Sequence, residues 1–210
     1  MISPRTIFWE VDVQADFMLP GGKLYVPGAE KIVPNVNRLV DAAREGRVLL
    51  ISSADAHDSS DAELREWPPH CLKGTAGAEL LPEARAARRL VIPNLRGAAL
   101  PADLSGWQQV TLEKNTLDVF DNPNAEALLA RLAPAGTPAF RSDLEFVVFG
   151  VVAEFCVLRA ADGLLQRGHR VALVRDAIQS LHAEKGPAIL EALTSRGARL
   201  ITTDQALALF

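Results

Sequence analysis

The strongest constraint on the fold is an apolar run that passes directly into a helical pattern. Residues 145–152 read Glu-Phe-Val-Val-Phe-Gly-Val-Val, which is typical of a β-strand buried on both faces. Residues 154–167 then place apolar side chains at helical spacing, and Gly168 follows as a helix stop signal. A strand that is buried on both faces needs helices above and below it. The run therefore predicts a parallel sheet that is covered on both sides.

The same alternation of strands and helices recurs along the chain. Further strands are predicted at residues 6–13, 47–52, 110–114, 171–174 and 199–202, and helices at 30–45, 124–132 and 183–195. Residues 90–93 form a short apolar run that is not counted as a main strand, and residues 134–138 read as a loop or small insertion. We therefore predict one α/β domain over residues 1–210, a three-layer αβα fold with a six-stranded, mostly parallel sheet.

Length and charge limit the classes of partner. A chain of 210 residues fits one domain with a full core, and its net charge of -4 without a long basic run argues against nucleic acid. No stretch reaches the roughly 18 apolar residues of a membrane span, and the N-terminus lacks a signal pattern. We expect a cytoplasmic protein that acts on a small molecule, and we leave a homo-oligomer open. Of its two cysteines, Cys71 and Cys156, we expect one reactive thiol and one bystander rather than a disulfide.

Polar residues follow the apolar runs at the points where the predicted strands end. They are Asp12 and Asp16, Asp55 and His57, Lys114, and Cys156. In an open parallel sheet, ligands bind at the carboxyl ends of the strands. These side chains therefore predict a site at one edge of the sheet.

Three of these residues could carry nucleophilic chemistry. Cys156 falls near the start of the predicted helix 154–167, where free N–H groups and the helix dipole favour a thiolate. Asp12 closes a buried strand, where a carboxylate with a shifted pKa could act as a general base. Lys114 is the cation that could hold both groups ionised. The alternatives are a buried inert cysteine, an aspartate that caps a turn, and a solvated lysine.

A second group of residues resembles a metal site. Asp55 and His57 are two positions apart, and His70 follows a Pro-Pro segment that fixes the backbone. Glu63 or Glu66 could add an oxygen ligand. Oxygen and imidazole ligands suit one divalent ion, with zinc preferred and iron or manganese as alternatives. The opposing interpretation is a polar loop with incidental histidines.

Several segments together resemble the nicotinamidase/pyrazinamidase branch of the isochorismatase-like cysteine hydrolases. These segments are 12–17 (Asp-Val-Gln-Ala-Asp-Phe), 55–57 (Asp-Ala-His), 67–78 (Trp-Pro-Pro-His-Cys-Leu-Lys-Gly-Thr-Ala-Gly-Ala), 113–115 (Glu-Lys-Asn) and 150–156 (Gly-Val-Val-Ala-Glu-Phe-Cys). The resemblance extends from Phe8 to about Leu207. It implies hydrolysis of nicotinamide, and of pyrazinamide, through a thioester on Cys156, within NAD salvage.

The resemblance also implies roles for individual residues. It implies a catalytic triad of Asp12, Lys114 and Cys156; metal ligands Asp55, His57 and His70; ring contacts from Phe17 and Trp67; a cis peptide at Val151-Val152; and an oxyanion hole formed by the N–H groups of Val152 and Cys156.

The chain departs from the family pattern at three places. Many members have another histidine soon after the Asp-x-His pair, and residues 58–63 contain none, so Glu63 is the candidate replacement. Glu10 stands in the first strand where an apolar residue is usual, on the side of Asp12 by strand alternation. The segment 134–141 is longer than usual. Two other functions stay open: a related amidohydrolase that acts on an N-carbamoyl or other small amide, and a non-catalytic binding module.

Overall fold

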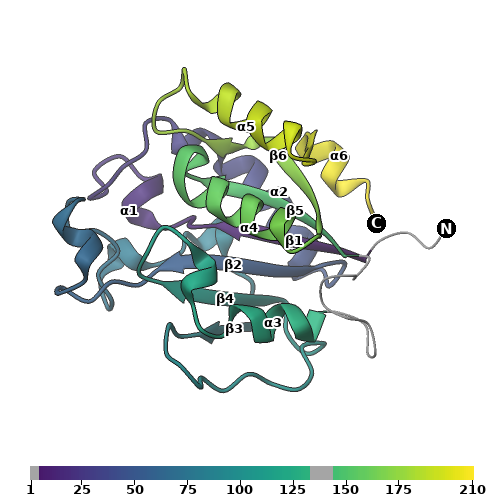
Figure 1. Ribbon diagram of the computed structural model, residues 1–210, viewed down its shortest axis with the longest axis horizontal. Helices are drawn as coiled ribbons and strands as arrows, with labels where there is room; N and C mark the ends of the chain where they lie inside the picture. The colour runs from purple at the N-terminus through teal and green to yellow at the C-terminus, as the bar shows by residue number, and fades with distance from the viewer. Residues whose placement is uncertain (1–4, 133–143) are drawn as a thin grey trace.

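Strand β1 (Arg5–Val11) lies in the middle of a seven-stranded sheet in the computed structural model (Figure 1). The order is β3-β4-β2-β1-β5-β6-β7, and neighbouring strands pair in parallel. The other strands are β2 (Leu49–Asp55), β3 (Arg89–Ile92), β4 (Gln109–Lys114), β5 (Leu144–Val151), β6 (Arg170–Gln179) and β7 (Arg199–Ile201). The structure describes residues 5–132 and 144–210, so the predicted loop at 134–138 and the long segment 134–141 lie outside the described residues.

Helices cover both faces of the sheet, which confirms the α/β class. The helices are α1 (Ala15–Met18), α2 (Val33–Arg44), α3 (Ala125–Leu132), α4 (Leu158–Gln166), α5 (Gly186–Ser195) and α6 (Thr203–Leu207). Helices α3 and α4 lie in front of the sheet in Figure 1, and α2 lies behind it. Helix α2 also packs against α6, and α4 against α5. Within the described ranges, none of these helices is long and apolar enough to cross a membrane.

The prediction of six strands is wrong by one. The additional strand is β3, which pairs with β4 through residues 89–92 and lies at the edge of the sheet. The following Pro93 cannot donate a backbone hydrogen bond, and it ends the strand after a short run. An edge position tolerates this because the strand has to pair on one side only.

Two predicted helices begin differently from their patterns. The helix predicted at 30–45 starts as a 3₁₀ turn (Ala29–Ile32) and becomes α-helical only in α2. The helix predicted at 154–167 starts as a π turn (Ala153–Val157) before α4. Such π turns frequently occur at functional sites, and this one contains Cys156.

The direction in which the chain leaves each strand defines the ligand-binding edge. From β1 the chain continues to β2 on one side, whereas from β5 it continues to β6 on the other side. The carboxyl ends of β1 and β5 therefore form the switch point at which open parallel sheets bind ligands. Asp12 follows β1 at this point, and Cys156 follows β5.

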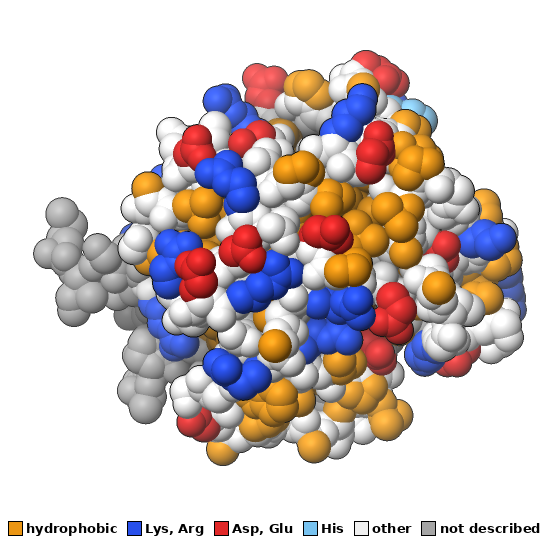
Figure 2. Space-filling model, turned by 180° about the vertical axis from the view of Figure 1, so that it is seen from behind, with side chains coloured by type: hydrophobic (Ala, Val, Ile, Leu, Met, Phe, Trp, Pro, Cys, Tyr) orange, Lys and Arg blue, Asp and Glu red, His pale blue; other side chains and the backbone are white. Residues whose placement is uncertain are grey.

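Figure 2 shows the molecule from behind Figure 1. Acidic and basic side chains are intermixed over this face, with small hydrophobic groups between them. The side chains of Asp12 and Cys156 at the switch point are almost entirely buried.

Candidate active site

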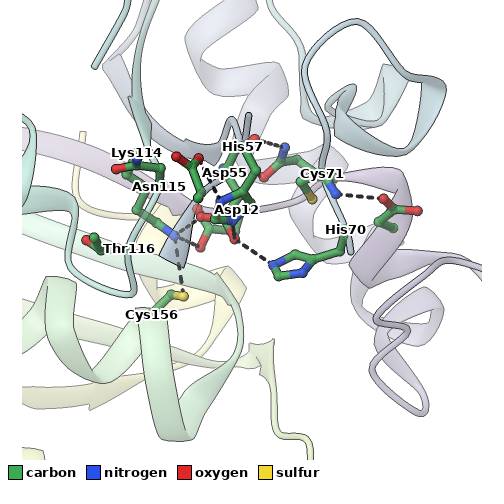
Figure 3. A network of polar contacts seen from close by, with 12 residues as sticks. Asp12, Asp55, His57, His70, Cys71, Lys114, Asn115, Thr116 and Cys156 are labelled. Carbon is green, nitrogen blue, oxygen red and sulfur yellow. Dashed lines mark hydrogen bonds and ion pairs between the residues drawn. The ribbon is translucent and has the colours of Figure 1, made fainter. Parts of the chain in front are cut away.

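A buried ammonium group stands at the centre of the site (Figure 3). Lys114 Nζ lies 2.9 Å from Asp12 Oδ2 and 3.5 Å from Cys156 Sγ, and it also contacts Asp55 Oδ1. Asp12, Asp55 and Lys114 are 1–3% exposed, and Cys156 is 7% exposed. The structure therefore brings the three predicted triad residues together, and it adds the predicted metal ligand Asp55 to the same cluster.

The backbone conformation of Asp12 explains how its side chain reaches this cluster. In the strand register, Ser53 pairs with Leu112 and Asp55 with Lys114, so these side chains share one face of the sheet. Asp12 leaves the strand with φ of 51°, which interrupts the alternation after Val11. Its Oδ1 then accepts a 2.6 Å hydrogen bond from Ser53 Oγ. Strand alternation would instead have kept Asp12 on the side of Glu10, as the sequence had suggested.

Burial and charge together set the protonation of the cluster. Burial raises the pKa of Asp12, and the Lys114 ammonium opposes this shift. Burial alone would also raise the pKa of Asp55, but Lys114 and the nearby histidines lower it below its usual range. Burial would lower the pKa of Lys114, yet the two carboxylates hold it well above its ordinary value. Lys114 is therefore a permanent cation in this site.

The thiol differs from its predicted state. Burial raises the pKa of Cys156 well above its ordinary value; Lys114 opposes that shift, and Asp12 and Asp55 add to it. The expectation of a thiolate at a helix N-terminus is therefore wrong, because burial outweighs the neighbouring cation. Deprotonation of Cys156 needs a base, and Asp12 is the carboxylate that contacts Lys114 beside it without being a candidate metal ligand.

The predicted metal ligands form a compact cluster beside Lys114. One ligand atom from each of Asp55, His57, Glu63 and His70 lies within 4.8 Å of the others. Asp55 Oδ2 is 3.9 Å from His57 Nε2 and 3.6 Å from His70 Nε2, so both rings direct this nitrogen to one point. Glu66, the other predicted oxygen donor, is exposed and is not part of the cluster.

The surroundings of the two imidazole rings fit a bound divalent ion. His70 Nδ1 lies 2.7 Å from the carbonyl oxygen of Pro68, and because a carbonyl only accepts, Nδ1 carries the proton. In the neutral ring, Nε2 then holds a lone pair. Both nitrogens of buried His57 have no hydrogen-bond partner in the described part of the chain. A divalent ion at Nε2 would remove part of this unfavourable burial. Two imidazoles and two carboxylates suit zinc, iron or manganese.

A largely apolar pocket connects the metal-ligand cluster to the thiol. It is lined by Phe17, Leu24, Val26, Asp55, Glu63, Trp67, His70, Leu117, Val152, Phe155, Cys156 and Leu181. Phe17 and Trp67, the predicted ring contacts, both line it. The Trp67 ring packs edge-on against Phe155, with centroids 5.4 Å apart. The Val151-Val152 peptide is cis, and both residues predicted for the oxyanion hole line the pocket.

Two residues of the turn after β1 organise the site: Gln14, which the strand-end pattern did not single out, and Asp16, which it placed at the site without a role. Gln14 pairs with the backbone of Asp55: its Nε2 donates to the carbonyl at 2.8 Å, and its Oε1 accepts from the N–H at 2.7 Å. Asp16 accepts hydrogen bonds from the N–H groups of Lys23 at 3.0 Å and Cys71 at 2.8 Å. These bonds attach the metal-ligand segments to the turn after β1. In the sequence, the short distance of Gln14 and Asp16 from Asp12 is the one signal that could have indicated this role.

Gly77 and Cys71 complete the attachment at Asp16. A side chain at Gly77 would collide with the Asp16 carboxylate. Cys71 itself has φ of 44° and is fully buried, and burial raises the pKa of its thiol. Both cysteines are free, as predicted, and Cys71 lies outside the metal-ligand cluster. Cys71 therefore acts through its backbone, which places His70.

Comparison with known proteins identifies the family. The isochorismatase domain model matches residues 7–94 and 84–205, which is most of the chain. The chain belongs to the isochorismatase domain family. The nicotinamidase/pyrazinamidase of Mycobacterium tuberculosis is 26% identical over 91% of this chain and 95% of its own length. A probable inactive nicotinamidase of Arabidopsis thaliana is 35% identical, but the match covers only 37% of this chain and 44% of that protein.

Solved structures share the fold over nearly the full length. The zinc complex of Pyrococcus horikoshii pyrazinamidase has a TM-score of 0.71 at 27% identity, covering 95% of this chain and 99% of that chain. The N-carbamoylsarcosine amidase of Thermoplasma acidophilum has a TM-score of 0.71 at 24% identity, covering 95% and 97%. The names nicotinamidase and pyrazinamidase indicate an amidohydrolase, and the likeness to N-carbamoylsarcosine amidase shows the shared fold.

Proposed function

We propose that the protein is a cysteine amidohydrolase that converts nicotinamide to nicotinate and ammonia, and that also accepts pyrazinamide. One observation carries the proposal: a single pocket joins the Cys156 thiol to the cluster of Asp55, Glu63 and His70. Phe17 and Trp67 line the same pocket and suit the faces of a flat ring. An aromatic amide with a ring nitrogen would present its amide carbon to the thiol, its ring nitrogen to the metal-ligand cluster, and its ring faces to Phe17 and Trp67.

In this mechanism Asp12 takes the proton from Cys156 Sγ as the sulfur attacks the amide carbon. Lys114 lies beside both groups and stabilises the negative charge as it passes from Asp12 to sulfur and back. The carbonyl oxygen becomes an oxyanion, which the N–H groups of Val152 and Cys156 would hold. The Val152 N–H belongs to the cis peptide between Val151 and Val152.

The tetrahedral adduct then collapses with cleavage of the C–N bond. Asp12 returns its proton to the leaving nitrogen, ammonia departs, and a thioester remains on Cys156. Water attacks the thioester carbon while Asp12 accepts one of its protons. The C–S bond breaks, nicotinate leaves, and the proton returns to the thiol, so the overall reaction consumes one water molecule.

The metal-ligand cluster would select the substrate. Asp55, His57 and His70 would hold one divalent ion, with Glu63 as a fourth ligand. When bound, this ion supplies a Lewis acid for the ring nitrogen of the substrate. Phe17 and Trp67 would hold the ring so that the amide carbon faces Cys156.

The second candidate is a related amidohydrolase of N-carbamoyl or other small amides. It would use the same Asp12, Lys114 and Cys156, and the fold likeness to N-carbamoylsarcosine amidase keeps it open. Such a substrate has no ring nitrogen to engage the metal-ligand cluster. Ammonia release from nicotinamide, pyrazinamide and N-carbamoyl amides, each with and without chelator, separates the two candidates.

The decisive variant is Cys156→Ala. Removal of a catalytic nucleophile should lower kcat for nicotinamide by about four orders of magnitude or more. Cys71→Ala is the matched control, because that thiol lies outside the pocket lining, and the variant should retain kcat within a few-fold. Retained ammonia release by Cys156→Ala would reject the mechanism. A third possibility, a binding module without activity, predicts no ammonia release from any amide by the wild-type protein.

A further inference from the structure

The two imidazole rings of the metal-ligand cluster have different partners on their outer sides. Both turn Nε2 toward Asp55, which leaves Nδ1 to face outward. For His70 the outward partner is the neutral carbonyl of Pro68. For His57 it is a carboxylate, because Asp61 Oδ2 lies 3.4 Å from His57 Nδ1. Asp61 takes no part in the proposed proton transfers.

The position of the Asp61 carboxylate is fixed by its own turn. The N–H of Asp58 donates to Asp61 Oδ2 at 2.9 Å, and the N–H of Asp61 donates to the carbonyl of Asp58 at 3.0 Å. The Asp61 side chain is 16% exposed, and that of His57 is fully buried. The carboxylate is therefore held against the ring edge rather than moving freely in solvent.

Among the groups described around His57, Asp61 is the one that lies beside Nδ1. Asp55 lies on the Nε2 side, and the His70 ring packs edge-on with its centroid 4.8 Å away. The His57 backbone is used by Cys71 and Lys73 and offers nothing to its own ring. At 3.4 Å the contact with Asp61 is an ion-pair distance that does not yet satisfy hydrogen-bond geometry.

We propose that Asp61 is a positioning residue for the metal site, and that it acts by accepting the Nδ1–H of His57. This inference rests on the metal-binding part of the proposed function. The hydrogen bond would fix the tautomer in which Nε2 holds the lone pair, and the negative charge would increase the basicity of that nitrogen. His70 gains orientation from its neutral carbonyl partner but less basicity. The two histidines therefore contribute unequally to metal affinity.

The test measures zinc affinity rather than turnover. Asp61→Asn keeps the shape of the side chain and removes its charge. The dissociation constant of Zn²⁺, measured by competition with a chromogenic chelator, should increase about 10- to 100-fold. The matched control is Asp58→Asn in the same turn, whose side chain is exposed and pairs with Lys73. It should keep the wild-type constant within about twofold. Equal constants for Asp61→Asn and wild type would overturn the inference.

A measurement on the wild-type protein does not depend on the folding of a variant. Nitrogen-15 NMR of the zinc-loaded protein should show His57 with a proton on Nδ1 and zinc on Nε2. Zinc on Nδ1 would overturn the inference. His70→Ala separates the two proposals: if it loses zinc while Asp61→Asn does not, Asp61 has no such role and the metal site stands. If the wild-type protein binds no zinc, both the inference and the metal-binding part of the proposed function fail.

Discussion

The buried carboxyl groups of Asp12 and Glu10 lie close together along β1, and they differ in the polar partners that surround them. At the carboxyl end, Asp12 and Asp55 share the Lys114 ammonium, and Asp12 gains a hydrogen bond from Ser53. Within the strand, Glu10 is fully buried, and neither of its carboxyl oxygens has a hydrogen-bond partner in the ranges that the structure describes. Among the described residues, Arg89 and Arg44 lower the pKa of Glu10, but neither forms an ion pair with it as Lys114 does with Asp12.

The register shows why the two groups remain separate. Glu10 pairs with Ser52, and Ser52 with Thr111, so the three side chains form a row on one face of the sheet. Ser53 and Lys114 point to the other face. Burial raises the pKa of Glu10 well above its ordinary value, which favours the neutral acid. Lys114 thus lowers the pKa of Asp55 and opposes the rise in the pKa of Asp12, whereas the pKa of Glu10 rises with burial.

The largest effect should follow removal of the shared cation. In Lys114→Met, two buried carboxylates lose their counter-charge, which should cost about 3–5 kcal/mol of the free energy of unfolding. The pKa of Asp12 should also rise, because Lys114 lowers it, so the acid limb of kcat/KM should move to higher pH. Urea unfolding at pH 7 in the presence of chelator measures the first effect.

An exposed lysine provides the control. Lys73 pairs with Asp58, and both side chains are largely in solvent, so Lys73→Met should change the free energy of unfolding by less than about 1 kcal/mol. If Lys114→Met cost no more than Lys73→Met, the buried cluster would not depend on its cation, and the contrast with Glu10 would disappear.

A smaller, pH-dependent effect should follow from Glu10→Gln. The pKa of Glu10 in the folded protein is raised above its ordinary value of 4.5. Between these two pKa values the unfolded chain has an ionised Glu10 and the folded protein a neutral one, so unfolding releases a proton. Glu10 should therefore contribute a loss of wild-type stability as pH rises above about 4.5, of about 1.4 kcal/mol per pH unit until its folded pKa is reached. The Gln variant cannot ionise and should lack this slope. Thermal or urea unfolding from pH 4 to pH 7 compares the two curves.

The test of Glu10 is the pH dependence of the free energy of unfolding, not a constant difference in that free energy between the variant and the wild type. The amide of the variant brings two new donors into the core, and their cost does not vary with pH. Glu45→Gln, at an exposed side chain, should follow the wild-type curve. Parallel curves for Glu10→Gln and wild type would mean that Glu10 is ionised in the folded protein and has a partner after all.

The smallest effect compares two neighbouring serines on opposite faces. Ser53→Ala removes the hydrogen bond to Asp12, so the pKa of Asp12 should rise and the acid limb of kcat/KM should move up by about one pH unit at most. Ser52 instead accepts a hydrogen bond from Gln109, and Ser52→Ala should leave the limb in place. An equal shift in both variants would show that the two faces are electrostatically coupled.

The sequence was informative wherever a polar residue ended an apolar run. Asp12, Asp55, Lys114 and Cys156 follow such runs, and the rule for parallel sheets then predicts that they meet at one edge. The αβα arrangement follows from the same alternation. Phe17 and Trp67 were found through the family resemblance, not through spacing, and both line the pocket.

Properties that depend on burial or backbone angle could not be predicted. Aspartate adopts positive φ more often than most residues, but this preference does not set the angle at one position, so alternation placed the Asp12 side chain on the wrong face. The raised pKa of the Cys156 thiol depends on how deeply the pocket buries it. Asp61 resembled any other acid of a polar loop until the ring of His57 was placed beside it.

The turn after β1 has a consequence for how such a protein can diversify. Gln14 is hydrogen-bonded to Asp55 and Asp16 to Cys71, so residues 12–16 set the distance between Asp12 and the segment that carries the candidate metal ligands. Insertion of a single residue before Gln14 would displace the hydrogen bonds of Gln14 to Asp55 and of Asp16 to Cys71 together. Residues 58–66, which include Asp61 and Glu63, take no part in these hydrogen bonds. Changes in residues 58–66 would therefore alter the candidate ligand Glu63 and its neighbour Asp61, whereas Asp12 and Asp55 would keep their relative positions.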